Sequence, residues 1–150
     1  MKVKIKKLHP DAVVPKYATE GSAGFDLVAL ENVIIYQGET LLIKTGLSVE
    51  IPMGYELQIR PRSGTSLKTP LRVANSPGTV DSDYRGEICV IMTNTDPLVP
   101  GYATERFFIL KGERIAQGVI CPIVQAEFEV VEELSSTDRG AGGFGSTGKT

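Results

Sequence analysis

The stretch Leu47-Ser48-Val49-Glu50-Ile51-Pro52-Met53-Gly54-Tyr55-Glu56-Leu57-Gln58-Ile59-Arg60 contains two short runs in which apolar and polar residues alternate. Alternation with a period of two is typical of β-strands that bury one face. Pro52-Met53-Gly54 separates the two runs and supplies the residue types that a tight turn needs. The segment therefore predicts two strands joined by a turn, and it indicates an all-β protein.

The same pattern continues along the chain, where short alternating or apolar runs occur at residues 3–6, 41–43 and 128–130. We find no long amphipathic helix, and only residues 63–68 are expected to form a helical turn, with Ser63 as its N-cap. Turn residues recur at the spacing of a β-sandwich or barrel, at 37–38, 76–78, 94–97, 100–101 and 111–112. Together these signals predict an antiparallel, distorted jelly-roll barrel.

Length and charge limit the partners of the protein. The 150 residues fit one domain, with residues 1–138 as the barrel and residues 139–150 as an arm. Sixteen basic and 18 acidic residues are mixed along the chain, which gives a net charge of −2 and no electrostatic footprint for nucleic acid or an anionic membrane. No apolar run has the length of a membrane span or the form of a signal peptide, so we expect a soluble, cytoplasmic protein with a small-molecule partner.

Histidine and cysteine chemistry is limited as well. His9 is the single histidine, which excludes a His-dependent triad or a multi-His zinc site and leaves acid–base chemistry to carboxylates. Cys89 and Cys121 are too widely separated in sequence to resemble a metal-ligand pair, and we expect two buried thiols.

Residues 139–150 form a glycine-rich tail, Arg139-Gly140-Ala141-Gly142-Gly143-Phe144-Gly145-Ser146-Thr147-Gly148-Lys149-Thr150. It fits both G-x-x-x-x-G-K-T and G-x-G-x-x-G, but each pattern requires a following helix, for which the sequence offers no residues. Closely spaced glycines still let backbone N–H groups converge on an anion. We therefore expect a flexible arm that closes over a polyphosphate. A disordered linker is the alternative, which the Phe144 ring and the Arg139 guanidinium disfavour.

Two polar segments suit phosphate binding. Residues 60–66, Arg-Pro-Arg-Ser-Gly-Thr-Ser, combine two guanidiniums, hydroxyls and a glycine, although a solvated polar loop would have the same composition. Gln117 ends the segment Gly112-Glu113-Arg114-Ile115-Ala116-Gln117, where its amide could bond a phosphate oxygen or an ordered water. The alternative for this segment is a tight turn at the start of a strand.

Residues 81–87, Asp-Ser-Asp-Tyr-Arg-Gly-Glu, are the acidic centre and follow a predicted hairpin over residues 75–80. In strand geometry Asp81 and Asp83 would share one face. A carboxylate beside bound phosphate can orient and deprotonate a water, as phosphoanhydride hydrolysis requires, whereas a solvated strand edge is the alternative. Asp26 stands in an apolar run, where it could hold a water of Mg²⁺ or be a satisfied structural carboxylate.

Five segments together resemble, in order and spacing, the five motifs of the trimeric dUTPases. They are AGFDL at 23–27, PRSG at 61–64, GTVDSDYRG at 78–86, GERIAQ at 112–117 and RGAGGFGSTG at 139–148. The resemblance spans nearly the whole chain. Two features depart from the family pattern: Thr65-Ser66 replaces a more usual apolar pair, and the loop over residues 96–106 is longer than common. Neither departure affects a position with an assigned role.

The resemblance implies hydrolysis of dUTP to dUMP and pyrophosphate with Mg²⁺, which limits uracil incorporation into DNA and supplies dUMP. It implies that Asp81 activates the water attacking the α-phosphorus, that Tyr84 stacks under the deoxyribose, and that Asp26 contacts the hydration shell of Mg²⁺. It also implies a homotrimer in which each site draws segments from three subunits. The implied substrate contacts are Asn75, Gly78 and Val80 at the uracil, Arg62, Ser63, Gly64 and Gln117 at the phosphates, and Arg139, Phe144, Gly145, Ser146 and Thr147 from the arm.

Three rival functions remain. A dCTP deaminase of the same fold would need its own catalytic glutamate and arginine set, which we cannot identify in the sequence. A non-catalytic nucleotide-binding relative would be expected to lack Asp81 or the glycine-rich tail, and both are present. A P-loop ATPase would need a long βαβ pattern that the chain does not have.

Overall fold

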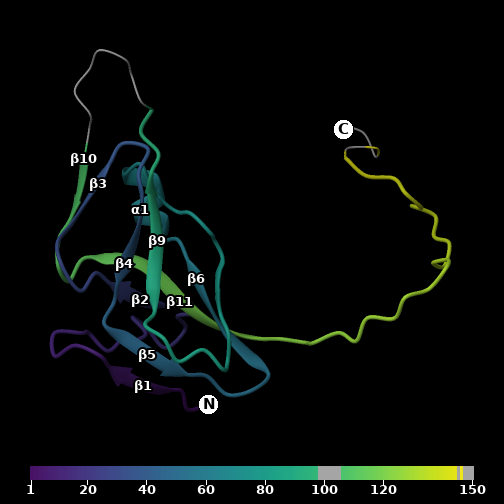
Figure 1. Ribbon diagram of the computed structural model, residues 1–150, viewed down its shortest axis with the longest axis horizontal. Helices are drawn as coiled ribbons and strands as arrows, with labels where there is room; N and C mark the ends of the chain where they lie inside the picture. The colour runs from purple at the N-terminus through teal and green to yellow at the C-terminus, as the bar shows by residue number, and fades with distance from the viewer. Residues whose placement is uncertain (98–105, 145, 147–150) are drawn as a thin grey trace.

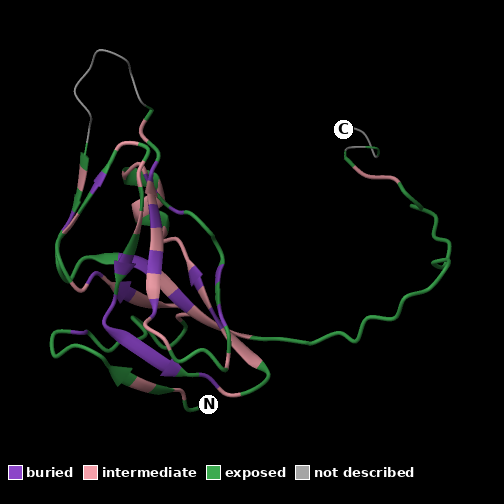
Figure 2. Cartoon of the chain, in the orientation of Figure 1, coloured by how far each residue is buried: buried purple, intermediate pink, exposed green. Residues whose placement is uncertain are grey.

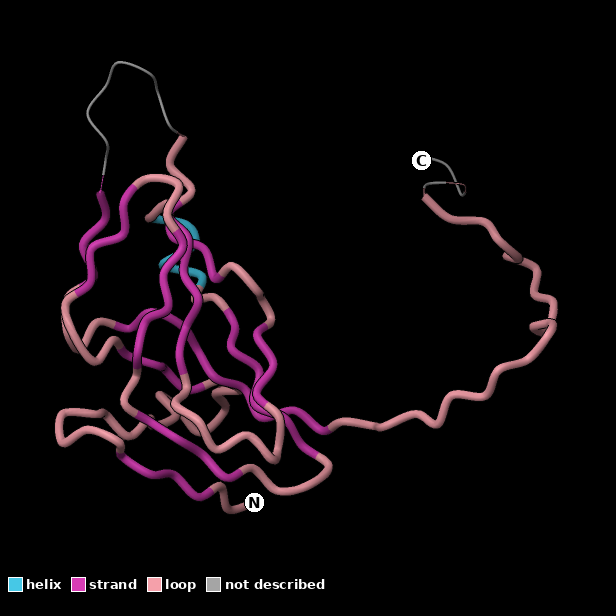
Figure 3. The backbone as a smooth tube through the Cα atoms, viewed as in Figure 1, coloured by secondary structure: helices cyan, strands magenta, loops and turns pink. Residues whose placement is uncertain are grey.

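The computed structural model describes residues 1–97, 106–144 and 146. In this part the chain forms β-strands and one short helix, which confirms the all-β prediction (Figure 3). The elements are β1 (Lys4–Lys7), β2 (Phe25–Val28), β3 (Val33–Tyr36), β4 (Thr40–Lys44), β5 (Leu47–Glu50), β6 (Tyr55–Arg60), α1 (Ser63–Lys68), β7 (Leu71–Val73), β8 (Gly78–Val80), β9 (Cys89–Asn94), β10 (Arg106–Ile109) and β11 (Arg114–Pro122).

All of the strand pairs are antiparallel. The strands form sheets in the orders β2-β11-β6-β8, β4-β9-β7, β1-β5 and β10-β3. The two strands predicted from residues 47–60 do form, but β5 pairs with β1, beside which it lies in Figure 1, while β6 lies between β11 and β8 in the four-stranded sheet. The Pro52-Met53-Gly54 turn therefore passes the chain from one sheet to another. Such crossings are what close antiparallel strands into a jelly roll rather than a row of hairpins.

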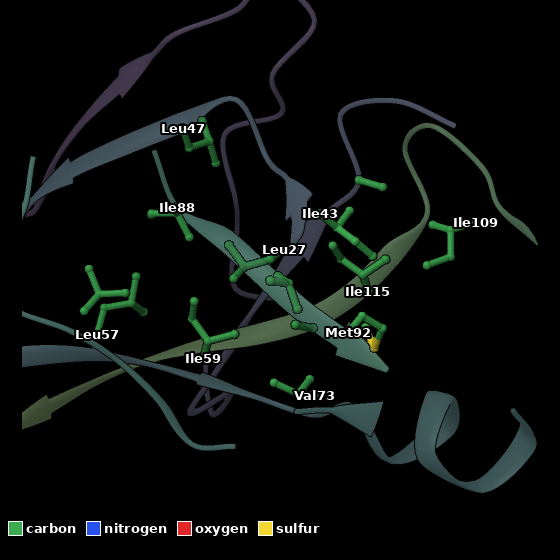
Figure 4. Close-up of a cluster of buried hydrophobic side chains, with 14 of the residues drawn as sticks. Leu27, Ile43, Leu47, Leu57, Ile59, Val73, Ile88, Met92, Ile109 and Ile115 are labelled. Carbon is green, nitrogen blue, oxygen red and sulfur yellow. The ribbon is translucent and has the colours of Figure 1, made fainter. Parts of the chain in front are cut away.

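The core is a single cluster of buried apolar side chains to which all four sheets contribute, including Leu47 of β5 and Ile109 of β10 (Figure 4). Leu27 and Leu57 come from the four-stranded sheet, and Ile43 and Met92 from the three-stranded sheet, with at most 1% of each residue exposed. Asn94 is also fully buried, and its amide group donates to the Ile35 carbonyl oxygen at 3.2 Å. Burial of apolar side chains supplies most of the folding free energy, so this cluster fixes the frame that carries the loops.

The described chain after β11 leaves the barrel and forms no further strand (Figure 1). The predicted strand at residues 128–130 is therefore wrong, although its alternating pattern is real. Phe128 is 92% exposed and Val130 fully exposed, because no strand in the described part of the chain pairs with them. The segment after β11 is coloured as exposed along most of its length (Figure 2). An alternating sequence forms a strand only where a partner satisfies its backbone groups.

Three smaller expectations also need correction. Arg62, not Ser63, occupies the N-cap position of α1 with an extended backbone, and no side chain caps the helix there. Strands β7 and β8, on either side of residues 74–77, pair with β9 and β6 and not with each other, so residues 75–80 are not a paired hairpin. Cys89 and Cys121 are only partly buried.

No helix in the described ranges combines the length and the apolar character needed to span a membrane.

Candidate active site

A polar pocket of about 390 Å³ gathers the predicted phosphate-binding residues. The pocket lies where β2 and β11 run beside the end of β6 and the start of α1, so segments distant in sequence contribute to it. Lys16, Arg62 and Arg114 bring three positive charges to its wall, whereas Asp26 brings one negative charge. The excess of positive charge suits an anionic ligand. Its lining includes Ser63, Gly64 and Gln117 among the predicted residues.

Asp26 links two arginines of this pocket. Its Oδ1 accepts a hydrogen bond from Arg62 Nε at 2.7 Å, and its Oδ2 accepts one from Arg114 Nη1 at 3.2 Å. The side chains of Asp26 and Arg62 are 30% and 24% exposed, so their ion pair is partly shielded from water. Charge-assisted bonds of this kind fix the direction of a guanidinium as well as its position. Asp26 thus holds both arginines at the mouth of the pocket.

Gln117 is placed by strand register. It stands opposite Asp26 of β2 and opposite Arg60 of β6, in the middle of the four-stranded sheet. Its side-chain Nε2 donates to the Pro61 carbonyl oxygen at 2.9 Å, which connects β11 to the segment before α1. A shift in register between Arg114 and Ala116 changes the direction of β11 just before Gln117. Such a bulge re-aims side chains, and here it allows Arg114 to reach the Asp26 carboxylate.

A second, smaller pocket of about 200 Å³ gathers the predicted nucleoside residues and the predicted catalytic acid. It lies at the end of β8 and beside β9. The predicted residues that line it are Asn75, Gly78, Val80, Asp81 and Tyr84. Val80 is buried, whereas Asp81 and Tyr84 are exposed. This pocket shares no lining residue with the phosphate pocket.

The segment after β8 is a turn and not a strand. β8 ends at Val80, and the backbone N–H of Tyr84 donates to the Asp81 carbonyl oxygen at 3.2 Å. The expectation that Asp81 and Asp83 share one strand face is therefore wrong, because the chain reverses direction between them. Of these two aspartates, Asp81 lines the smaller pocket and Asp83 does not.

Cys89 also lines the smaller pocket, a position that the sequence did not indicate. Burial raises the pKa of the Cys89 thiol, the nearby Glu87 carboxylate raises it further, and Lys44 lowers it. A thiol whose pKa lies above its ordinary value stays protonated at neutral pH, so Cys89 is a poor nucleophile. The carboxylates that line this pocket are those of Asp81 and Glu87, and Glu87 Oε1 accepts the Gly46 N–H at 2.7 Å.

The described arm residues line neither pocket. Arg139 Nε donates to the Gly142 carbonyl oxygen at 2.9 Å, and the Ser146 N–H donates to the Gly143 carbonyl oxygen at 3.0 Å. The Phe144 ring is fully exposed. Gly145 and Thr147, which the resemblance also assigns to substrate binding, lie outside the described residues.

Mg²⁺ fits this chain only together with a phosphate ligand. Within the described residues, no three His, Cys, Asp or Glu side chains are grouped so that they could hold a metal ion. Asp26 is the only carboxylate in the described lining of the phosphate pocket, and two guanidiniums already bond it. Mg²⁺ commonly keeps several waters and binds through substrate phosphates. The donor set therefore fits an ion carried by phosphate oxygens that contacts Asp26 through water.

Sequence reasoning missed several lining residues. Arg114 stands within the GERIAQ segment, and a guanidinium in a segment already predicted to bind phosphate was a usable signal. Lys16 and Ser22 line the phosphate pocket, and Leu42 and Ile91 line the smaller one. No pattern in the sequence marked these four residues, because each is brought to its pocket by tertiary packing alone.

The fold and the two pockets define an antiparallel jelly-roll protein with a cationic pocket for an anionic ligand. The dUTPase family model matches residues 11–148. The chain is 59% identical over 149 residues to the deoxyuridine 5′-triphosphate nucleotidohydrolase of Nautilia profundicola, covering 99% of this chain and 100% of that protein. It is 51% identical over 148 residues to the enzyme of the same name from a Helicobacter pylori strain, covering 99% and 97%. The chain therefore belongs to the dUTPase family.

Solved structures agree with this assignment. A mutant dUTPase of Staphylococcus bacteriophage 80alpha with dUpNHpp superposes with a TM-score of 0.88 at 31% identity, covering 98% of both chains. A mutant dUTPase from phage phi11 of S. aureus, described for its coordination of a structural Mg(II) ion, gives 0.82 at 29% identity, covering 89% of this chain and 98% of that one. The predicted family and the predicted jelly-roll fold are both confirmed.

Proposed function

We propose that this protein hydrolyses dUTP to dUMP and pyrophosphate in the presence of Mg²⁺. The family, the names of the relatives and the dUpNHpp held by the phage 80alpha enzyme support dUTP as the substrate. The observation that carries the proposal is that Asp26 bonds both Arg62 and Arg114. These bonds hold two guanidiniums in the wall of a polar pocket whose net charge is positive, as a triphosphate requires. Guanidinium groups suit phosphate because their planar donors match its oxygens.

Asp81 acts as the general base in this proposal. Its carboxylate takes a proton from a water, and the water oxygen forms a bond to the α-phosphorus of dUTP. The bond from the α-phosphorus to the bridging oxygen then breaks, and pyrophosphate leaves with that oxygen. A bound Mg²⁺ would neutralise phosphate charge during this step. Asp81 is free for the role, since no ion pair in the described part of the chain engages its carboxylate.

Selectivity has a separate origin in the smaller pocket. The Tyr84 ring would pack under the deoxyribose and leave no space for a 2′-hydroxyl, as the family resemblance implies. Asn75, with the backbone from Gly78 to Val80, would hydrogen-bond the uracil edge. A site built to pair with uracil leaves unmatched polar groups against cytosine, which disfavours dCTP.

We also infer that the active protein is a homotrimer in which the pockets and the arm come from different copies. Three observations support this. The phosphate pocket and the smaller pocket share no residue, the described arm residues line neither, and the segment over residues 123–138, which connects β11 to the arm, carries exposed apolar side chains. Val124, Phe128, Val130 and Leu134 are each at least 88% exposed. A segment with this much exposed apolar surface is expected to pack on another chain.

The barrel has an apolar groove that suits the segment over residues 123–138. The groove has a volume of about 520 Å³ and lies beside β1, β2 and β5. Val3, Ile5, Val14, Tyr17 and Phe25 are among its lining residues. We infer that residues 123–138 of a second copy occupy it, because the alternating apolar residues 124, 128 and 130 match an apolar groove in character.

The first experiment compares pyrophosphate release from dUTP, dTTP, dCTP and UTP with Mg²⁺ present. Release from dUTP alone is expected, because Tyr84 would exclude the 2′-hydroxyl of UTP and the groups that pair with uracil would disfavour dCTP. Ammonia from dCTP would instead move the protein to the deaminase branch of the fold. No reaction with any of the four nucleotides would contradict an enzymatic function and favour a nucleotide-binding protein.

A further inference from the structure

Two side chains that line the smaller pocket, those of Tyr84 and Asn75, lie directly over glycines. Tyr84 lies over Gly86, where an added Cβ would overlap the Tyr84 hydroxyl oxygen and Cζ and would stand 2.9 Å from Cε2. Asn75 lies over Gly78, where an added Cβ would stand 2.9 Å from Nδ2 and 3.4 Å from Cγ and Oδ1. Contacts this close require the absence of a side chain at both glycines.

The Tyr84 ring is held in its place by the backbone around Gly86. The Tyr84 hydroxyl donates to the Glu87 carbonyl oxygen at 3.1 Å. Glu87 is itself fixed, because its Oε1 accepts the Gly46 N–H at 2.7 Å, and the neighbouring Arg85 carbonyl oxygen accepts the Ser48 hydroxyl at 2.8 Å. The ring therefore rests on a segment that is anchored to the chain at the start of β5.

Gly78 has an equally fixed setting. It is buried at the start of β8 and stands opposite Ile59 of the central strand β6. The Asn75 side chain is exposed and lies over it. Because β6 also pairs with β11, the backbone beneath Asn75 belongs to the most extensively paired sheet of the protein. The glycine can move little, so an added methyl group must displace the amide.

We propose that Gly86 and Gly78 are positioning residues that set two separate selectivities, Gly86 for the sugar through Tyr84 and Gly78 for the base through Asn75. The proposal rests on the proposed function. At both sites the atoms nearest to an added Cβ belong to the outer end of one side chain and not to backbone. A substitution there turns that side chain aside while the barrel stays folded. Each glycine therefore acts on selectivity through its own partner.

The test compares kcat/KM for dUTP, UTP and dCTP in Gly86→Ala and Gly78→Ala. Gly86→Ala is expected to lower the preference for dUTP over UTP by about tenfold or more and to leave the preference over dCTP unchanged. Gly78→Ala is expected to lower the preference for dUTP over dCTP by about tenfold or more and to leave the preference over UTP unchanged. Gly21→Ala is the matched control, because its Cβ meets nothing within 4 Å and Gly21 has no positive φ. An equal fall for all three nucleotides in either variant would overturn the proposal.

A double-mutant cycle separates positioning from a general disturbance of the loop. In a Tyr84→Ala background, Gly86→Ala is expected to cause no further change in the dUTP-to-UTP ratio, because the displaced ring is already gone. A further loss in that background would refute the role of Gly86. If Gly86→Ala lowers the melting temperature so far that kinetics fail, Tyr84→Phe serves instead. It removes only the bond to the Glu87 carbonyl oxygen, and an unchanged selectivity would then refute the anchoring.

Failure of the proposed function is distinguishable from failure of this inference. If the unaltered protein released no pyrophosphate from dUTP, the proposed function itself would be wrong. If it hydrolysed dUTP selectively and both alanine variants kept its full selectivity, only the role of the glycines would be wrong.

Discussion

Asp81→Asn gives the sharpest test of the proposed chemistry, because the structure separates its effect on turnover from its effect on folding. Asp81 is exposed just after β8, and no ion pair in the described part of the chain holds its carboxylate. The substitution should therefore change the free energy of unfolding by no more than about 0.5 kcal/mol. For a domain of this size, that corresponds to a shift in melting temperature of about 2 °C at most.

Turnover should respond on a different scale. Loss of a general base typically costs about 10² to 10⁴ in rate, which is about 2.7 to 5.4 kcal/mol of activation free energy. The assay is pyrophosphate release from dUTP under single-turnover conditions, together with calorimetric binding of dUpNHpp, which should remain close to normal. Asp83→Asn is the matched control, because Asp83 is also exposed, belongs to the same turn and does not line the pocket. Turnover of Asp81→Asn above a tenth of normal, or an equal loss in Asp83→Asn, would refute the assignment.

Three further predictions concern the phosphate pocket, the segment over residues 123–138 and the arm. Asp26→Asn removes the partner of Arg62 and Arg114, so the KM for dUTP should rise about tenfold, while partial exposure limits the loss of unfolding free energy to about 1 kcal/mol; steady-state kinetics with an unchanged KM would contradict this. Phe128→Ser should weaken the trimer by about 2 kcal/mol for each copy, since the ring is 92% exposed in the single chain and would be buried in the trimer. Sedimentation across a dilution series measures the dissociation of the trimer. Deletion of residues 140–150 should reduce dUTP turnover by about a hundredfold without a change in melting temperature; a truncated protein with full turnover would show that the tail is only a linker.

Much of the fold could be predicted from the sequence, because alternation and turn residues are local signals. The runs at 47–51 and 55–60 became β5 and β6 within a residue of their expected bounds. Their partners could not be predicted, since pairing is decided by which apolar faces can close over a common core. The error at residues 128–130 has the same origin. The pattern there shows that the side chains suit a strand, and it does not show whether the strand's partner lies in the same chain.

The site divides in a similar way. The family was predicted from the resemblance of five segments, in order and spacing, to the motifs of the dUTPases, and the guanidinium, hydroxyl and amide groups of those segments suit phosphate binding. The geometry between those segments was not predictable. Asp26 was expected to hold a water of Mg²⁺ or to be a satisfied structural carboxylate, and its bonds to two guanidiniums from segments 36 and 88 residues away were not expected. These long-range contacts depend on the registers of β11 against β2 and against β6, which could not be predicted from the sequence alone.

The ion pairs of Asp26 also change how its own role is understood. A carboxylate that faces two guanidiniums cancels part of their charge, yet it keeps them directed at one point before any ligand arrives. Pre-orientation lowers the entropy that a bound triphosphate must lose, and it does so most for long side chains such as arginine. The remaining positive charges of Lys16 and the two arginines still exceed the single negative charge of the described lining. The pocket therefore combines pre-oriented arginines with a net positive charge, and in the proposed function a Mg²⁺ carried by the phosphates would contact Asp26 through water.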